Sequence, residues 1–505
     1  MTEGKSIQHD KVEQFVPYIG DFGRYQKLLC LVLAVLDFPI SMQATFGYFA
    51  TLTPEWRCVR NSTECLFNGT FSGADERRCN FGPDEWYYIK GKDYSLTTQY
   101  GLHCSKKFLS TLIMSIFFIG WGLGAVVIGW IADRHGRKRV IMPCVIVTFV
   151  LGFISPFIPN VYVLVLFRFI MGFAFPGVLV QTAILLTEYV GNDMRPYAKV
   201  LPGVAINMSW MAVAVKSYLV QNWKYLSMIC TAPYVFVLLF HFVIPESARW
   251  LHLQNRSDEA MDVLHNIAKW NKKEIPPHVT LTSSTHITVH KPKSNASLLF
   301  KTKALRRKSF VQIFLWMNAA LLGYGLQFAA KSLGGSFYFN FIILAAMGLP
   351  ATCIAAFVNR RFGRKISTVG HLLVGSIMCL SIACIPRNIK VVKVILGIVG
   401  KMCGTASFFS LYLWAAEMYP TNIRAVAMGV MQVSARIGSA MSPWVVLELG
   451  VFGEWVPFLV IGLVSLVGSS LGCLLTDTKG TVLEDSVDPD PGNDANATEL
   501  VQESI

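Results

Sequence analysis

The sequence predicts an all-α integral membrane protein with twelve transmembrane helices in two six-helix halves, and three observations support this. Of the 505 residues, 53% are hydrophobic and 15% are charged, whereas soluble proteins carry about 25% charged residues. The apolar residues gather in runs of about 20, the length that crosses the hydrocarbon core of a bilayer. Two short charged signatures occur once in each half of the chain.

The apolar runs are the predicted helices, because the bilayer core offers no partner for unpaired backbone groups. The segment 1–26 is polar and charged, which favours a retained first helix over a cleaved signal peptide. The twelve runs are 27–50, 108–132, 139–158, 161–186, 198–220, 225–244, 310–330, 336–358, 366–386, 391–416, 426–448 and 454–475.

The predicted organisation follows from these runs. Residues 1–26 precede an N-terminal six-helix half, 27–244, whose first helix is followed by a long loop at 51–107. A second long loop, 245–309, leads to the C-terminal six-helix half, 310–475, and residues 476–505 form a tail. The tail is rich in Asp, Pro, Gly and Asn from residue 484, a composition typical of disorder.

The charged signatures repeat at similar intervals. Asp-Arg-His-Gly-Arg-Lys at 133–138 is matched by Arg-Arg-Phe-Gly-Arg-Lys at 360–365, and Glu188…Arg195 is matched by Glu417…Arg424. Each later copy follows the earlier one at nearly the same offset, which indicates two related halves. In a membrane protein, that pattern is typical of a transporter.

Positive charge is concentrated in a few loops. The chain has a net charge of +14, and twelve Lys and Arg residues lie between Arg249 and Lys308. Basic loops stay on the cytoplasmic side of a membrane, so we expect both termini there and the loop 51–107 outside, with the protein in the plasma membrane. The charge therefore indicates topology, and we expect no nucleic-acid partner.

The loop 51–107 has the composition of an extracellular segment. It contains two glycosylation sequons, at Asn61 and Asn68. An oxidising compartment favours two disulfide bonds among its four cysteines, and the sequence leaves all three pairings open. The cysteines are Cys58, Cys65, Cys79 and Cys104.

The second loop and the tail carry weaker signals. Residues 257–268 are predicted to form an amphipathic helix with Ser257 as its N-cap, and 275–297 are predicted to form a linker. The last three residues, Glu503, Ser504 and Ile505, are compatible with a PDZ-type scaffold partner.

The charged signatures also predict a cytoplasmic gate. Gly136 and Gly363 allow tight turns between successive helices, and the nearby arginines can pair with acids at helix ends, closing the cytoplasmic side in one state and parting in the other. The alternative is that these charges only set topology. The predicted gate residues are Asp133, Arg134, Arg137, Glu188, Glu246, Arg249, Arg364, Glu417 and Arg424.

Several motifs resemble those of known transporters. Residues 129–138 resemble the signature between helices 2 and 3 of the major facilitator superfamily. Residues 245–251, Pro-Glu-Ser-Ala-Arg-Trp-Leu, and 417–424, Glu-Met-Tyr-Pro-Thr-Asn-Ile-Arg, resemble the organic cation, anion and zwitterion transporters, as does the segment 19–25. The resemblance implies the superfamily fold and carriage of small organic ions through the bilayer by alternating access, without a cofactor and with a possible co-transported or exchanged ion.

Ionisable residues inside membrane helices are costly and point to function. Arg436 can bind a carboxylate through two hydrogen bonds, or it forms a structural ion pair. Asp37 pairs with Arg168, Lys216 or Arg436, carries a coupled proton, or binds an ammonium group. Lys401 is a second cation, of a kind common in the family. Lys216 contacts substrate or extends to the membrane interface, and Arg168 resembles an arginine found across the superfamily.

The resemblance also implies the walls of the substrate site. Trp316, Tyr324, Phe408 and Tyr412 match positions that line the cavity of anion carriers, although aromatic residues at helical spacing also pack against helices or lipid. Weaker candidates by the same comparison are Gln432, Trp210, Asn207 and Gln43.

The chain departs from its relatives at three positions. Gly323 stands where an aromatic residue is common, Gly348 where an acid is common, and Thr352 where some dicarboxylate exchangers have lysine. The pocket is therefore expected to be roomier and less charged, which puts dicarboxylate exchange in doubt.

The expected function is transport of small organic anions such as urate, nicotinate or other carboxylates. Arg436 argues against simple cations, but Asp37 keeps a carnitine-like zwitterion or an organic cation as the alternative. A non-transporting sensor or scaffold is a further hypothesis. The sequence has no phosphate loop, zinc motif or catalytic constellation, so we expect neither an enzyme nor a metal site.

Overall fold

The computed structural model describes residues 7–9, 12–59, 65, 69–73, 76–82, 84–191, 194–240, 243–281, 296–386 and 388–480. The predicted glycosylation sites Asn61 and Asn68, most of the tail and the C-terminal residues 503–505 lie outside this described part of the chain.

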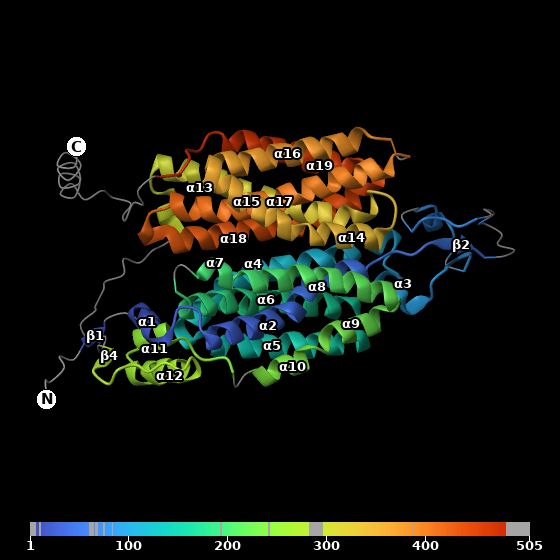
Figure 1. Cartoon of the computed structure of the whole chain (residues 1–505). Coiled ribbons are helices and arrows are strands. Elements are labelled where there is room, and N and C mark those ends of the chain that lie inside the picture. The colour runs from blue at the N-terminus through green and yellow to red at the C-terminus, as the bar shows by residue number, and fades with distance from the viewer. Residues whose placement is uncertain are drawn as a thin grey trace, which may run out of the picture.

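Two bundles of helices lie side by side in Figure 1, with the N-terminal half below and the C-terminal half above. The N-terminal half contains α2 (Arg24–Ala50), α4 (Lys107–His135), α5 (Arg137–Ile154), α6 (Val161–Tyr189), α7 (Arg195–Ala198), α8 (Val200–Leu219), α9 (Trp223–Thr231) and α10 (Tyr234–Leu239). The C-terminal half contains α13 (Lys303–Phe328), α14 (Phe337–Ala346), α15 (Gly348–Phe362), α16 (Arg364–Cys384), α17 (Lys390–Met418), α18 (Thr421–Pro443) and α19 (Val456–Gly472).

Short turns of helix extend or follow several of these elements. They are η5 (Ser155–Phe157), η8 (Ala296–Phe300), η9 (Ala329–Lys331), η10 (Trp444–Glu448) and η11 (Leu449–Phe452).

Nine helical segments in the described part of the chain are long and apolar enough to cross a membrane. The remaining three of the twelve predicted helices are present in other forms. The run 225–244 is broken into α9 and α10 beside Pro233, which has no backbone N–H to continue the helix. α19 spans only 17 residues, and α18 is less apolar because it carries Arg436 and several serines.

A kink also divides the predicted helix 336–358. α14 ends at Ala346 and α15 begins at Gly348. Pro350 lies four residues after Ala346, and a proline ring clashes with the carbonyl at that distance and removes the hydrogen bond. Gly348, at the start of α15, lies against Asn207 of α8 in the N-terminal half.

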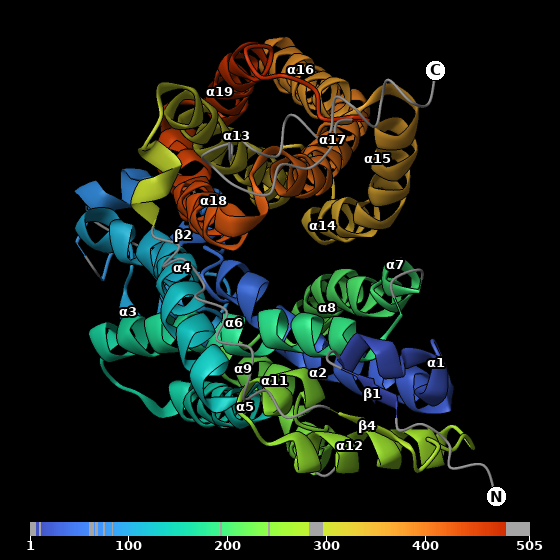
Figure 2. The same cartoon turned by 90° about the vertical axis from the view of Figure 1, so that its left-hand side faces the viewer.

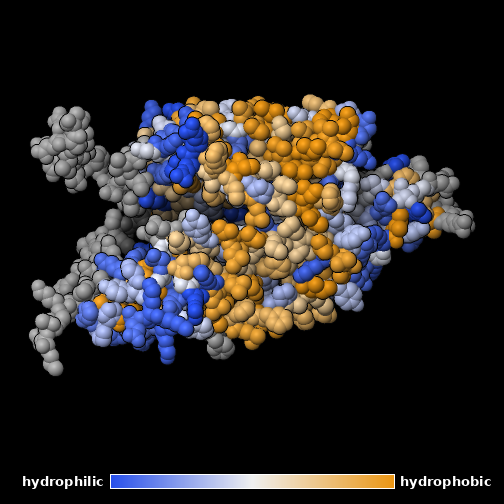
Figure 3. All heavy atoms as spheres, viewed as in Figure 1, coloured by the Kyte–Doolittle hydropathy of each residue, from blue (hydrophilic) through white to orange (hydrophobic). Residues whose placement is uncertain are grey.

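The two halves meet along three pairs of helices. α4 packs against α18, and α8 packs against α14 and α15, as Figure 2 shows in the end view. Apolar side chains form a broad band around the middle of the face seen in Figure 3, and hydrophilic side chains gather at both ends. Large apolar residues such as Trp130 and Phe357 are more than half exposed, as expected for lipid-facing surfaces.

The segment 51–107 forms a small folded unit at one end of the bundles, which we call the loop end (Figure 1). Two antiparallel strands, β2 (Trp56–Cys58) and β3 (Trp86–Tyr88), enclose the buried Trp56. Of the three pairings left open by the sequence, the structure has Cys58–Cys65 and Cys79–Cys104. The other elements are η2 (Glu76–Asn80), η3 (Lys92–Tyr94), α3 (Leu96–Tyr100) and η4 (Cys104–Lys106).

The opposite end, which we call the α12 end, carries a second small unit attached to the N-terminal half. The side chain of Asn271 accepts a hydrogen bond from the backbone N–H of Tyr25 and donates to the carbonyl of Ile19, at 2.8 and 2.6 Å, which fixes α12 to the start of α2. The elements are β1 (Ile7–His9), η1 (Val12–Phe15), α1 (Val16–Ile19), α11 (Ala248–Leu253), α12 (Ser257–Trp270) and β4 (Val279–Leu281).

Two predictions for this unit need correction. Ser257 is the first residue of α12, with Arg256 in the N-cap position, because the Ser257 hydroxyl contacts His252 Nδ1 at 3.1 Å instead of capping the helix. The predicted linker 275–297 contains β4, which pairs in parallel with β1. A three-residue strand whose partner lies near the start of the chain leaves no periodic signal in the sequence.

Candidate functional site

A cavity of about 580 Å³ lies between the two halves, within the size range of small-molecule sites. Residues of α2, α4, α6 and α8 form one wall, and residues of α13, α15, α17 and α18 form the other. The wall continues to Thr187 and Lys199 near the α12 end, where Figure 3 shows a cleft between the halves.

The loop end is closed by contacts between the halves. The Tyr48 hydroxyl donates to the carbonyl of Phe328, Thr111 Oγ1 donates to Glu448 Oε1 at 2.5 Å, and Ser115 Oγ donates to the carbonyl of Ala440 at 2.8 Å. The cavity is therefore accessible from the α12 end and sealed from the loop end.

Arg436 lies in the wall of this cavity. Its guanidinium carbon is 3.7 Å from the ring centroid of Trp121, and its Nη2 donates to Gln432 Oε1 at 3.3 Å. The side-chain amide of Gln432 in turn donates to the Tyr412 hydroxyl. No carboxylate within the described residues lies within 4.0 Å of Arg436, so the charge is held by an aromatic face and remains available to an anion.

Lys401 is the second cation of the cavity. Its Nζ donates to the carbonyl of Gly323 at 2.9 Å and lies 5.4 Å from the ring centroid of Trp210 and 6.0 Å from that of Tyr324. A Cβ built on Gly323 would lie 3.9 Å from Lys401 Nζ, an ordinary contact distance. Lys401 and Arg436 both approach the cavity from the C-terminal half.

Asp37 lines the same cavity from the N-terminal half. Thr182 Oγ1 donates to its carboxylate at 3.1 Å, and among the described residues no basic group lies within 4.0 Å of it. The first alternative for Asp37, an ion pair with Arg168, Lys216 or Arg436, is therefore not formed in this structure.

The side chains of Arg168 and Lys216 lie away from Asp37, because each donates hydrogen bonds to other groups. Arg168 donates to the carbonyl of Gln43 at 2.9 Å and to Gln43 Oε1 at 3.2 Å, and its guanidinium carbon is 4.7 Å from the ring centroid of Phe117. Lys216 Nζ donates to the carbonyl of Ile229 at 3.3 Å, on α9. Neither residue lines the main cavity.

Most of the predicted wall residues do line the cavity: Tyr324, Phe408, Tyr412, Gln432, Trp210 and Asn207. Two others lie behind it. The Trp316 ring packs behind Phe408 and Tyr412, at centroid distances of 5.3 and 4.6 Å, and Gln43 is occupied by Arg168. Trp316 is fully buried, so it supports the wall instead of forming it.

Gly348 contributes space. A side chain built on Gly348 would overlap the Oδ1 atom of Asn207 on the facing helix α8. Glycine at position 348, where relatives commonly have an acid, therefore lets the two halves approach closely. It leaves Asn207 in the cavity wall and adds no carboxylate.

Three notable wall residues, Trp121, Thr182 and Lys199, were not predicted from the sequence. A signal for Trp121 was present in the run Gly120-Trp-Gly-Leu-Gly124. Backbone atoms of α6 approach Gly120 and Gly124 so closely that a side chain at either position would overlap them. Glycines of that spacing mark the face of α4 that packs on α6. The Trp121 ring lies between the halves, 4.1 Å from the Phe175 ring of α6 and 3.7 Å from the guanidinium carbon of Arg436 on α18.

The predicted gate residues of the N-terminal half form a cluster at the start of α5. Glu246 Oε1 accepts hydrogen bonds from the backbone N–H groups of Arg137, Lys138 and Ser247, at 2.8, 3.2 and 3.0 Å. The Arg137 guanidinium lies 3.5 Å from Glu188 and 3.3 Å from Asp133. A carboxylate at a helix N-terminus is favoured by the unpaired N–H groups there.

The C-terminal half repeats this arrangement at the start of α16. Arg364 donates twice to Glu417 Oε1, at 3.1 Å from Nε and 2.6 Å from Nη2. Asp477 Oδ1 accepts from the backbone N–H groups of Arg364 and Lys365, at 3.1 and 3.4 Å. Asp477 was missed, although it follows Glu246 at nearly the interval that separates the other repeated residues.

The geometry of the two clusters explains why positions 136 and 363 are glycine. Gly136 and Gly363 have φ values of +103° and +97°, which L side chains rarely adopt. A side chain at either position would also overlap the capping carboxylate of Glu246 or Asp477. The turn and the cap therefore require glycine together.

These ion pairs each lie within one half and are formed while the α12 end is open. This corrects the expectation that they part when that end opens. The other predicted gate residues also contact their own half: Arg249 pairs with Glu13 at 3.2 Å, Arg134 lies over the Trp130 ring, and Arg424 Nε donates to the carbonyl of Tyr419 at 3.2 Å.

The cavity offers three cations, one carboxylate and several aromatic faces, a set that suits small organic ions with a ring and a carboxylate. In the described part of the chain, no group of three or more His, Cys, Asp or Glu residues is placed to hold a metal ion.

Comparison with known proteins supports the fold. The xylose transporter XylE from E. coli, in a partially occluded inward open conformation, superposes with a TM-score of 0.63 over 92% of this chain and 100% of that chain, at 14% identity. The predicted major facilitator superfamily fold is confirmed.

Sequence relatives place the chain more narrowly. The model of the sugar (and other) transporter family matches residues 65–486. Solute carrier family 22 member 13 from Homo sapiens is 30% identical over 94% of this chain and 92% of that protein. Organic anion transporter 3 from Oryctolagus cuniculus is 30% identical over 80% and 76%, and organic cation/carnitine transporter 4 from Arabidopsis thaliana is 28% identical over 94% and 90%. The chain therefore belongs to solute carrier family 22 of the sugar (and other) transporter family, and it is a multi-pass membrane transporter of organic ions, not an enzyme.

Proposed function

We propose that this transporter carries small organic anions, such as urate, nicotinate or other carboxylates, across the plasma membrane by alternating access. The observation that carries the proposal is Arg436, whose guanidinium is held against Trp121 in the cavity wall without a carboxylate partner among the described residues. A substrate carboxylate would complete that site with charge-assisted hydrogen bonds.

Lys401 and the aromatic walls support the same proposal. Lys401 and Lys199 add two further positive charges, so the cavity carries more positive than negative charge even with Asp37 ionised. Tyr324, Phe408 and Tyr412 supply ring faces for a planar acid. In this proposal the α12 end is cytoplasmic, the loop end is extracellular, and both termini are cytoplasmic, as the distribution of basic residues favours.

A second candidate function rests on Asp37. Its carboxylate faces the cavity with Thr182 as its hydrogen-bond partner and no cation within 4.0 Å among the described residues. An ammonium group would fit there, and a molecule that carries both an ammonium and a carboxylate could contact Asp37 and Arg436 together. A carnitine-like zwitterion or an organic cation is therefore the alternative substrate.

The test is uptake by the full-length protein reconstituted in liposomes, with protein-free liposomes as the control. Labelled urate, nicotinate, carnitine and tetraethylammonium are compared in parallel, each with and without an imposed pH or sodium gradient. The proposal expects uptake of urate or nicotinate above that of both other compounds. Uptake of carnitine or tetraethylammonium alone would favour the alternative. Ligand binding without any flux would favour a sensor or scaffold.

A further inference from the structure

A second cavity, of about 190 Å³, lies at the loop end and is separate from the central one. Tyr48 and Phe328 line the outer cavity, and Tyr324 lines the central cavity. The rings of Phe328 and Tyr324 are neighbours, with centroids 6.1 Å apart, and Tyr48 is hydrogen-bonded to Phe328. An aromatic layer therefore divides the two cavities.

The outer cavity combines positive charge with an apolar lining. Arg78, Lys107 and Lys331 contribute three cations, and Glu454 contributes one carboxylate. The remaining wall includes the apolar residues Leu52, Leu102, Phe328, Val446, Leu447 and Val451. In the lining, three cations face one carboxylate, and Glu55 near the cavity also interacts electrostatically with Lys331. Cations beside apolar and aromatic surface suit an anion that carries a ring.

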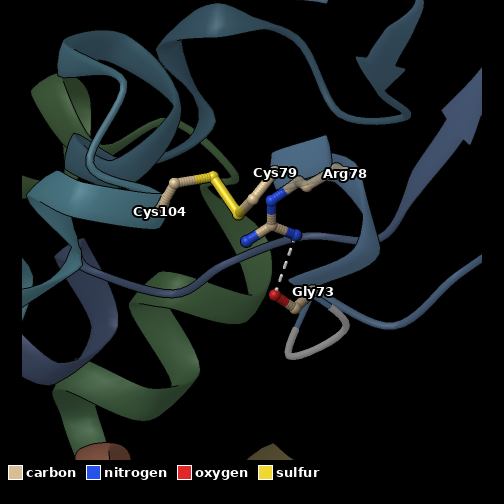
Figure 4. The surroundings of a disulfide bond; sticks show 4 residues. All are labelled: Gly73, Arg78, Cys79 and Cys104. Atoms are coloured by element: carbon tan, nitrogen blue, oxygen red, sulfur yellow. Dashed lines mark hydrogen bonds between the residues drawn. A yellow bond between two sulfur atoms is a disulfide. The ribbon is translucent and has the colours of Figure 1, made fainter. Parts of the chain in front are cut away.

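Arg78 is held in place by the fold of the loop, as Figure 4 shows. The neighbouring Cys79 is linked by a disulfide to Cys104, next to the start of α4, where Lys107 lies. Arg78 Nη1 donates to the carbonyl of Gly73 at 3.0 Å, and its guanidinium carbon lies 5.6 Å from the ring centroid of Tyr88. The side chain is buried, so its charge is fixed at the cavity before any ligand arrives.

The walls of the outer cavity come from three parts of the molecule. Tyr48 and Lys107 belong to the N-terminal half, Lys331 and Glu454 to the C-terminal half, and Arg78 to the loop. The halves are joined beneath it by the bond from Thr111 to Glu448. Alternating access requires the halves to separate at this end, and separation would pull the walls apart. A ligand held by both halves must therefore bind the closed state of the loop end more tightly.

We propose that the outer cavity is a regulatory site for a small aromatic carboxylate or sulfonate, which binds from the loop side and holds the loop end closed. Its size admits a single ring with one anionic group. Occupancy slows transport without competing for the central cavity. The effect on transport rests on the proposed alternating access, whereas binding at the site does not depend on the identity of the transported substrate.

Binding is tested with the full-length protein in lipid nanodiscs, where both ends are accessible, and with benzenesulfonate as the probe. Calorimetric titration of the wild type is compared with Lys107→Gln, which removes a cation of the outer cavity, and with Arg436→Gln, which removes one of the central cavity. Lys106→Gln is the matched control, because the exposed Lys106 is the adjacent residue, carries the same charge and does not line the cavity.

The expected result is benzenesulfonate binding that survives in Arg436→Gln, weakens about tenfold in Lys107→Gln and is unchanged in Lys106→Gln. Lys331→Gln provides a second variant from the other half, with the same expectation. Loss of all binding in Arg436→Gln would overturn the proposal, because the sulfonate would then bind only centrally. An equal loss in Lys106→Gln would also overturn it, because general surface charge would explain the binding.

A transport measurement completes the test. Benzenesulfonate added on the loop side of liposomes should lower the maximal rate of anion uptake without raising KM, and Lys107→Gln should remove most of that inhibition. Purely competitive inhibition would overturn the regulatory role. If no anion is transported at all, the proposed function fails while the binding result still stands, so the two failures are distinguishable.

Discussion

The two halves can be compared at the start of α5 and of α16. In the N-terminal half, Glu246 caps the helix and Arg137 pairs with Glu188. In the C-terminal half, Asp477 caps the helix and Arg364 pairs with Glu417. The capping residue differs in length, yet the same backbone groups are bound. The two halves therefore share the contacts made at these positions, although the residue that makes them differs.

The same two halves differ where they face the cavity. The C-terminal half contributes the two cations Lys401 and Arg436, whereas the N-terminal half contributes the carboxylate of Asp37 and, near the α12 end, Lys199. The basic residue of α6, Arg168, is turned away from the cavity and bound to Gln43. The repeat is therefore preserved where it supports the helices and has diverged where it meets the substrate.

The strongest test of this division is Arg436→Ala. We expect anion uptake to fall about 100-fold, because a charge-assisted contact to the substrate carboxylate is lost, and Arg436→Lys to restore part of it. Uptake kinetics in liposomes measure the effect, with surface expression or reconstituted amount as the control. Anion uptake that is intact in Arg436→Ala would contradict the charge role of the C-terminal half.

The N-terminal half is tested by Asp37→Asn, which removes the charge and keeps the shape. If the protein carries anions, we expect uptake to be maintained or to rise by a few-fold, because one repulsive charge is gone. If it carries a zwitterion or cation, uptake should fall about tenfold. Parallel uptake of nicotinate and carnitine distinguishes the two, and a loss of both would indicate a role for Asp37 in coupling.

The caps test the equivalence of the halves. Glu246→Gln and Asp477→Asn each remove a charge that binds several backbone N–H groups, so each should lower the free energy of unfolding by about 1–2 kcal/mol. Thermal unfolding of the purified protein measures the shift. A large shift in one variant and none in the other would show that only one half depends on its cap.

A smaller effect is expected at the loop end, which has no counterpart in the C-terminal half. Burial, together with the charges of Arg78 and Lys106, lowers the pKa of His103 from its ordinary value of 6.5. The unfolded loop therefore binds a proton more readily than the folded loop, and the folded loop loses stability as the pH falls below about 6.5. At higher pH, His103 is neutral in both states and the dependence disappears.

Hydrogen exchange of the β3 backbone measures this effect. Protection should fall by about two- to threefold between about pH 7.5 and 5.5, after correction for intrinsic exchange rates. His103→Gln should show no such change. A pH dependence of the same size in His103→Gln would assign the titration to another group.

Much of the fold was predictable from local sequence. The apolar runs predicted the helices because burial in lipid demands about 20 apolar residues in a row, and the repeats at 133–138 and 360–365 predicted the two halves. The break beside Pro233 and the kink before Pro350 were missed because a helix-breaking residue inside an apolar run is tolerated in membranes. β4 was missed because its partner is remote.

The site was predictable in part. Arg436, Lys401 and Asp37 stood out as charges in apolar helices, and all three line the cavity. Their partners could not be predicted, because contacts such as Arg436 with Trp121 depend on how α4 and α18 cross. Trp316 and Gln43 were expected on the wall from the family resemblance, which does not give the rotation of each helix relative to its neighbours in this chain.

The pairing of β1 with β4 bears on the biogenesis of the chain. Ile7 pairs with Val279, and translation of the segment between them takes about 15–50 s at typical rates. During that interval the N-terminal segment has no strand to join, while the helices of the first half are inserted. The two strands can pair only after the helices of the first half have been synthesised, so this pairing depends on the completed first half.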